Sequence, residues 1–84
     1  MNDREIPPKQ FANHVLKQVC SHMLADDIVV EPNDYMAMRV AFRSLGGLWS
    51  EVAYGDIVHL ELLKKVVTAW GNEPGRKHRS EETV

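Results

Sequence analysis

The sequence predicts a small, all-α domain, and three observations support that class. Three amphipathic stretches with helical spacing follow one another between residues 11 and 70. Hydrophobic residues make up 44% of the chain and charged residues 26%, as in an ordinary globular protein. The short β-branched run at residues 28–30 has no obvious second strand to pair with. We therefore expect one helical domain over residues 9–71, between a flexible lead at 1–8 and a disordered tail at 72–84.

The first helix is expected from about Lys9 to Ala25. Pro8 suits its first turn, where the missing N–H of proline is not needed. Its apolar arc consists of Phe11, Val15, Leu16, Val19, Cys20 and Met23. After this arc, residues 28–32 are expected to form an extended connector, because the residue before Pro32 avoids the helical region.

The second helix is expected to begin at Asn33 or Asp34, since both residue types are good N-caps. Its apolar stripe consists of Met38, Phe42, Leu45, Trp49 and Val52. Gly46 and Gly47 fall inside that stripe, and each internal glycine costs roughly 1 kcal/mol relative to alanine. We expect a kink or a short break there. A bundle of three helices is predicted, or of four if the glycine pair breaks the helix.

The third helix is expected over residues 57–70. Gly55 suits the end of the preceding helix, and Asp56 suits the N-cap of the next. The apolar surface of this helix is wide, which is typical of a helix covered on two sides. We expect it to be the central element. The predicted core consists of Phe11, Val15, Val19, Met23, Phe42, Leu45, Trp49, Leu60, Leu63, Val67 and Trp70.

The polar side of the second helix carries the candidate functional site. Two apolar side chains lie there between two arginines, above a glycine notch. The predicted partner-binding set is Met36, Arg39, Val40, Arg43 and Gly47. Methionine adapts to irregular partner surfaces, and arginine is enriched at binding hot spots. In the alternative interpretation, Met36 and Val40 pack beneath the connector and the arginines are simply solvated.

No catalytic or metal-binding motif is found. His14 and His22 lie eight residues apart, which is not a metal-ligand spacing, and neither HExxH nor CxxC occurs. Cys20 is expected to fill the core, and His59 to form a hydrogen bond within the fold. The sequence therefore predicts no enzyme activity, no cofactor and no metal.

We expect a cytoplasmic protein–protein interaction module that acts as a small adaptor, regulator or inhibitor by occupying a surface on a larger partner. Compact phage- and plasmid-borne regulators offer a loose analogy, based on size alone. The first alternative is a helix-turn-helix-like DNA-binding transcriptional regulator. Ten basic residues against twelve acidic ones, a net charge of −2, argue against nucleic-acid binding.

The second alternative is a structural homo-oligomer, since a core this small is commonly supported by self-association. No apolar run approaches 18 residues, so no membrane-spanning helix is expected. The polar first residues are not followed by the apolar segment of a signal peptide. Together with the unpaired Cys20, this favours the cytoplasm.

Overall fold

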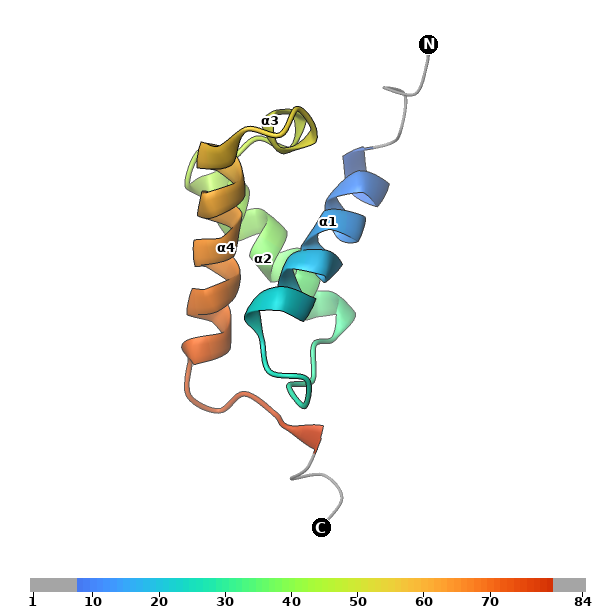
Figure 1. Cartoon of the computed structure of the whole chain (residues 1–84). Coiled ribbons are helices and arrows are strands. Elements are labelled where there is room, and N and C mark those ends of the chain that lie inside the picture. The colour runs from blue at the N-terminus through green and yellow to red at the C-terminus, as the bar shows by residue number, and fades with distance from the viewer. Residues whose placement is uncertain (1–7, 80–84) are drawn as a thin grey trace.

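The protein is an all-α bundle of four helices, seen in a computed structural model that describes residues 8–79 (Figure 1). The helices are α1 (Pro8–Met23), α2 (Pro32–Ser44), α3 (Trp49–Ala53) and α4 (Ile57–Asn72). The predicted fold class is therefore confirmed, and the glycine pair breaks the second helix instead of kinking it. Most of the expected flexible lead, residues 1–7, lies outside the described part, and Pro8 begins α1.

Helix α1 ends at Met23, two residues before the expected end, and Phe11 and Val15 of its predicted core are only partly buried. Its buried side chains are Ala12, Leu16, Val19 and Cys20. Among them, Leu16 is fully buried, and the Cys20 thiol donates to the sulfur of Met38 on α2 at 3.8 Å. Met23 is 41% exposed, so its assignment to the core is wrong. It is the last helical residue and has no facing helix, whereas the buried face of α1 looks toward α2, α3 and α4.

Helix α2 begins two or three residues earlier than expected from a cap at Asn33 or Asp34. The N-cap is Glu31, and Pro32 occupies the first turn. The carboxylate of Asp34 accepts a hydrogen bond from the Glu31 backbone N–H at 2.9 Å. Asp34 therefore stabilises the helix start from the third helical position, which corrects the expected cap.

The break between α2 and α3 folds the chain back onto its own core. Gly46 takes the left-handed conformation, with φ +94°, that commonly ends a helix. Trp49 can then pack on Phe42, with ring centroids 4.6 Å apart. Leu45, placed in the predicted core, is instead 64% exposed, because the helix ends one residue before it.

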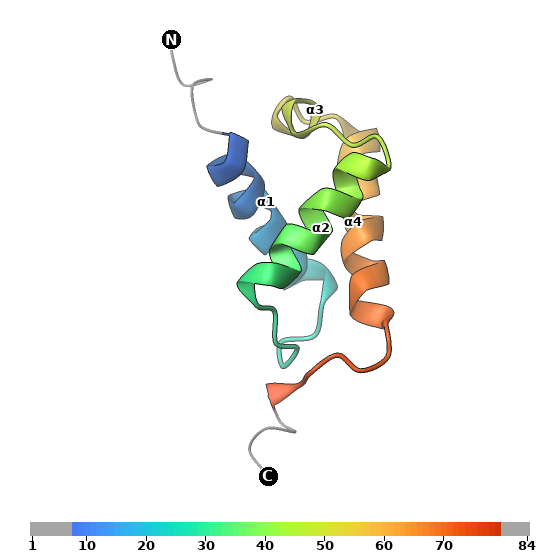
Figure 2. The ribbon, with the colours of Figure 1, turned by 180° about the vertical axis from the view of Figure 1, so that it is seen from behind.

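Helix α4 is central, as predicted. Its N-cap is Asp56, whose carboxylate accepts a hydrogen bond from the His59 backbone N–H at 3.1 Å. It contacts each of the other three helices, as α1 also does, and α2 lies on one side of the α1–α4 pair (Figures 1 and 2). The buried core consists of Ala12, Leu16, Val19, Cys20, Met38, Phe42, Trp49, Leu63, Val66, Val67 and Trp70.

The segment after α4 differs from the disordered tail expected from residue 72. The guanidinium of Arg76 lies 3.9 Å from the centroid of the Trp70 ring, and its Nε donates to the Trp70 carbonyl at 2.7 Å. Residues 77–79 then run alongside the connector, and the Val29 N–H donates to the Lys77 carbonyl at 3.0 Å. Residues 80–84 of the expected tail lie outside the described part of the chain.

Candidate functional site

The outer face of α2 carries two exposed apolar side chains beside an exposed arginine. Met36 is 52% exposed and Val40 60% exposed, and Arg43 lies one turn further along the same side. The alternative in which Met36 and Val40 pack beneath the connector is thereby contradicted. We call these three residues, with Arg39 at their edge, the α2 face. Figure 2 shows α2 from the side turned away from α1 and α4.

Arg39 is less free than the sequence suggested. Its side chain is half-buried, and Nη1 donates a hydrogen bond to the side-chain oxygen of Asn13 on α1. This contact joins α1 to α2, so Arg39 contributes to packing as well as to the border of the α2 face. Because a guanidinium has five N–H donors, the contact with Asn13 does not exhaust its capacity to bind.

Gly47 does not belong to the α2 face. It is buried, and a Cβ added to it would overlap the ring of Phe42. The prediction placed Gly47 on the helical surface by continuing α2 through the glycine pair. Because α2 ends at Ser44, that continuation is wrong, and the expected notch beside Met36 and Val40 does not form there.

A second apolar surface was not foreseen. Its residues come from the two loops that flank α3 and from the first turn of α4, which lie at one end of the bundle (Figure 1), and we call them the hydrophobic end. It consists of Leu45, Leu48, Tyr54, Ile57 and Val58, each at least 41% exposed. The Leu48 N–H donates to Nδ1 of His59 at 3.1 Å, which holds the α2–α3 loop against the first turn of α4. This bond also gives His59 the role within the fold that was expected of it.

One signal in the sequence pointed to the hydrophobic end. Ile57 and Val58 are adjacent apolar residues in the first turn of a helix, where fewer neighbouring turns are present to cover both. Tyr54 stands next to Gly55 in a turn, where little surrounding structure can cover an aromatic ring. The five residues lie close together in the sequence, within residues 45–58, but they belong to the α2–α3 loop, the turn after α3 and the first turn of α4, so helical spacing does not relate them to one another.

The titratable groups give no sign of an activated nucleophile. Burial raises the pKa of the Cys20 thiol from 9.0 to about 11, which keeps it protonated at neutral pH. Burial, and then the nearby Cys20 and Asp34, also raise the pKa of Tyr35. Within residues 8–79, no three His, Cys, Asp or Glu side chains gather as metal ligands would. None of the described helices has the length and apolar character needed to cross a membrane.

Known proteins offer no relative from which a function could be inferred, so the inference below starts from the geometry. The chain matches no protein-family model, and neither the curated proteins nor the solved structures contain a significant match to it.

Proposed function

We propose that the chain is a non-enzymatic, cytoplasmic interaction module that binds a larger protein partner through the α2 face. It would act as a small adaptor, regulator or inhibitor by covering a surface on that partner. The observation that carries the proposal is the exposure of Met36 and Val40 on a helix whose opposite side is anchored in the core by Met38 and Phe42. A rigid helix that presents adjacent apolar side chains is a common form of protein recognition.

The charge of this region indicates the chemistry of the partner. Residues 35–50 contain Arg39 and Arg43 but neither aspartate nor glutamate, although the whole chain has a net charge of −2. Arginine forms strong, oriented hydrogen bonds with carboxylates. The partner surface we propose is therefore an apolar cleft bordered by acidic side chains, with Met36 and Val40 as anchors and Arg43 at the rim.

The test removes the α2 face without disturbing the fold. The double variant Val40→Asp, Arg43→Glu changes two exposed residues, and Arg39 is left intact because it holds Asn13. A matched control, Lys65→Glu, reverses an exposed charge on α4. Affinity capture from cells of the native host is followed by binding titrations with the captured protein. The helicity of all three proteins is checked by circular dichroism.

The proposal expects the wild type and the control to capture the same partner and the double variant to lose it. In titrations, the double variant should bind at least about tenfold more weakly, as expected when a hot spot is removed. If the correctly folded double variant binds the partner as tightly as the wild type, the α2 face is not the docking surface.

Self-association is a second candidate, and the hydrophobic end is the observation that favours it. Five large apolar side chains are exposed within residues 45–58, and exposed apolar surface often marks a site of association where it is contiguous. A second copy of the chain could cover it. The α2 face would remain available in such an assembly, so the two candidates do not compete for the same residues.

The DNA-binding alternative is less well supported by the geometry. A recognition helix needs free basic groups, whereas Lys64 on α4 pairs with Glu61 at 3.3 Å. Arg76 in the basic segment after α4 is engaged by Trp70 and by Glu73, whose carboxylate lies 2.7 Å away. The test is a mobility-shift titration with DNA at several salt concentrations. DNA binding that weakens steeply as the salt concentration rises would support this alternative.

A further inference from the structure

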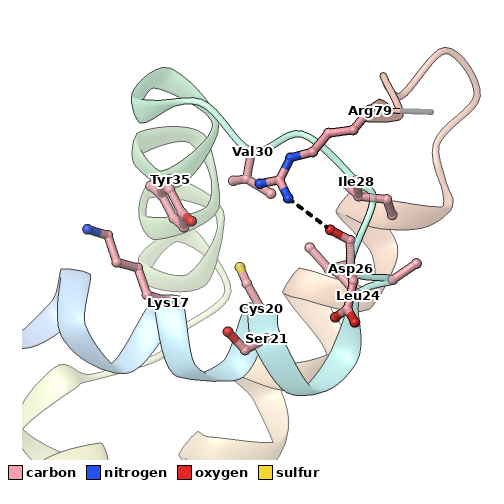
Figure 3. A pocket seen from close by; sticks show the side chains of 10 residues that line it. Lys17, Cys20, Ser21, Leu24, Asp26, Ile28, Val30, Tyr35 and Arg79 are labelled. Atoms are coloured by element: carbon pink, nitrogen blue, oxygen red, sulfur yellow. Dashed lines mark hydrogen bonds between the residues drawn. The ribbon is translucent and has the colours of Figure 1, made fainter. Parts of the chain in front are cut away.

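A pocket of about 320 Å³ opens between the second half of α1, the connector and the start of α2 (Figure 3). Its wall is mixed: polar groups come from Lys17, Ser21, Asp26 and Arg79, and the apolar part consists of Leu24, Ile28, Val30 and the ring of Tyr35. Cys20 lies between α1 and α2 and turns its sulfur toward this space. The volume is at the lower end of the range for small-molecule sites, roughly 300–1,000 Å³, so a ligand of modest size would fill it.

Two cationic side chains border the pocket from different parts of the chain. Figure 3 shows the guanidinium of Arg79 reaching over the pocket from the segment after α4, where Nη1 donates to the Asp26 carbonyl. That bond is long, at 3.4 Å, and leaves most of the donors of the guanidinium for another acceptor. On the opposite side, the Lys17 ammonium lies 6.0 Å from the centroid of the Tyr35 ring. Among the lining residues that the structure describes, Asp26 is the one acidic residue.

We propose that this pocket binds a small organic anion, namely a monocarboxylate with an apolar or aromatic body. The carboxylate would pair with Arg79, which matches its planar geometry and can bind it through two hydrogen bonds. The apolar body would pack between Val30 and the Tyr35 ring, where an aromatic ligand can stack. Lys17 would add to the positive potential. The proposal does not rest on the α2 face, because none of the lining residues belongs to it.

The position of Arg79 links the pocket to the fold of the segment after α4. The backbone N–H of Arg79 donates a hydrogen bond to the Asp27 carbonyl at 2.7 Å, and the Lys77 carbonyl accepts one from the Val29 N–H. A ligand that bridges Arg79 and the connector stabilises this arrangement, since it binds the state in which both are in place. Ligand binding should therefore slow hydrogen exchange at the Val29 amide.

The experiment is a titration of the isotope-labelled protein followed by amide chemical shifts. The probes are phenylacetate, indole-3-acetate and isovalerate, with phenylacetamide as the neutral counterpart of phenylacetate. The variants are Arg79→Gln and Lys17→Gln, which remove the two cations. Lys65→Gln removes an exposed lysine on α4 that does not line the pocket and is the matched control.

At least one carboxylate should give saturable shifts at Ser21, Ile28 and Val30, with a Kd on the order of 1 mM for a ligand of about ten heavy atoms. Arg79→Gln should weaken this binding at least about fivefold and Lys17→Gln less, while Lys65→Gln leaves it unchanged. If no carboxylate saturates, if phenylacetamide binds as well as phenylacetate, or if Arg79→Gln has no effect, the proposal is overturned.

Discussion

Gly47 leaves room for the most deeply buried ring of the core. Phe42 is fully buried, and its ring carbons occupy the space that a Cβ at Gly47 would take. The ring cannot withdraw, because Trp49 packs against it with centroids 4.6 Å apart. We predict that Gly47→Ala lowers the free energy of unfolding by about 1–3 kcal/mol, the usual cost of overpacking, as measured by urea denaturation.

Gly71→Ala is a matched control for this prediction. A Cβ there would also overlap a neighbour, but that neighbour is the end of the flexible Leu24 side chain, which can rotate away. Gly71 lies within α4, where alanine is favoured over glycine by roughly 1 kcal/mol. Gly71→Ala should therefore be much less destabilising than Gly47→Ala. Equal losses in the two variants would contradict this explanation of Gly47.

Cys20 should make the fold sensitive to alkaline pH. The folded thiol has a pKa of about 11, whereas an unfolded thiol ionises near 9.0, so the folded state holds the proton more tightly. Its contribution is fully present below pH 9 and is lost as the pH rises toward 11. The loss is at most about 2 kcal/mol after allowance for solvent screening.

Urea unfolding of the wild type and of Cys20→Ala at several values between pH 8 and pH 10.5 checks this prediction. The raised pKa of Tyr35 acts in the same direction, and burial, its main cause, is present in both proteins. Because Cys20 adds to that shift, the difference between the two proteins reports the thiol together with its effect on Tyr35. The free energy of unfolding should fall less steeply with pH in Cys20→Ala. Parallel curves would show that ionisation of Cys20 is not coupled to folding.

Helix α4 holds the segment that follows it through Arg76. The cation–π contact with Trp70 and the hydrogen bond from Nε to the Trp70 carbonyl fix the point at which the chain turns back toward the connector. Arg76→Ala removes both contacts, which together are worth on the order of 1–2 kcal/mol. We predict that the Val29 amide, which donates to the Lys77 carbonyl, then exchanges with solvent several-fold faster.

Hydrogen exchange resolved by residue checks this prediction. Amides in the middle of α4, such as that of Leu63, should keep their protection, because the variant leaves the core intact. Arg43→Ala, which removes an exposed arginine far along the chain from this segment, serves as the control and should leave Val29 unchanged. Unaltered exchange at Val29 in Arg76→Ala would mean that the backbone contacts hold the segment without the arginine.

In the molecule as a whole, periodic features were predictable and contacts between distant segments were not. The glycine pair predicted the four-helix alternative, and helical spacing predicted the exposed side of α2, because Met36 and Val40 lie opposite Met38 and Phe42 on the helix. The same reasoning misplaced Met23 and Leu45 in the core, since it assumed that helices pack along their full length. Gly47 was misplaced for the related reason that the helix was continued past its end.

The hydrophobic end and the pocket were missed because neither has a periodic signature. Each is assembled from segments that the fold brings together, as when Arg79 reaches the connector some fifty positions earlier in the chain. The segment after α4 is held by the contacts of Arg76 with Trp70 and Glu73, by side-chain contacts of His78 and Arg79 with Asp27 and Asp26, and by a few backbone hydrogen bonds. Such interactions depend on the position of the partner and not on the spacing of apolar residues.

The hydrophobic end should make the bundle associate at high concentration. Association is favoured because contact between two copies removes these five apolar side chains from water. A stable dimer buries about 800 Å² per partner, which is more than five side chains supply, so we expect the association to be reversible. Sedimentation velocity of the wild type should show a rise in mass with concentration, and Val58→Glu should abolish it. Val58 is an exposed residue of the first turn of α4, so this change leaves the core intact.

Met36→Ser on the α2 face is the control and should associate like the wild type. A wild type that stays monomeric at several hundred micromolar, or a Met36→Ser variant that loses association, would contradict the assignment of self-contact to the hydrophobic end.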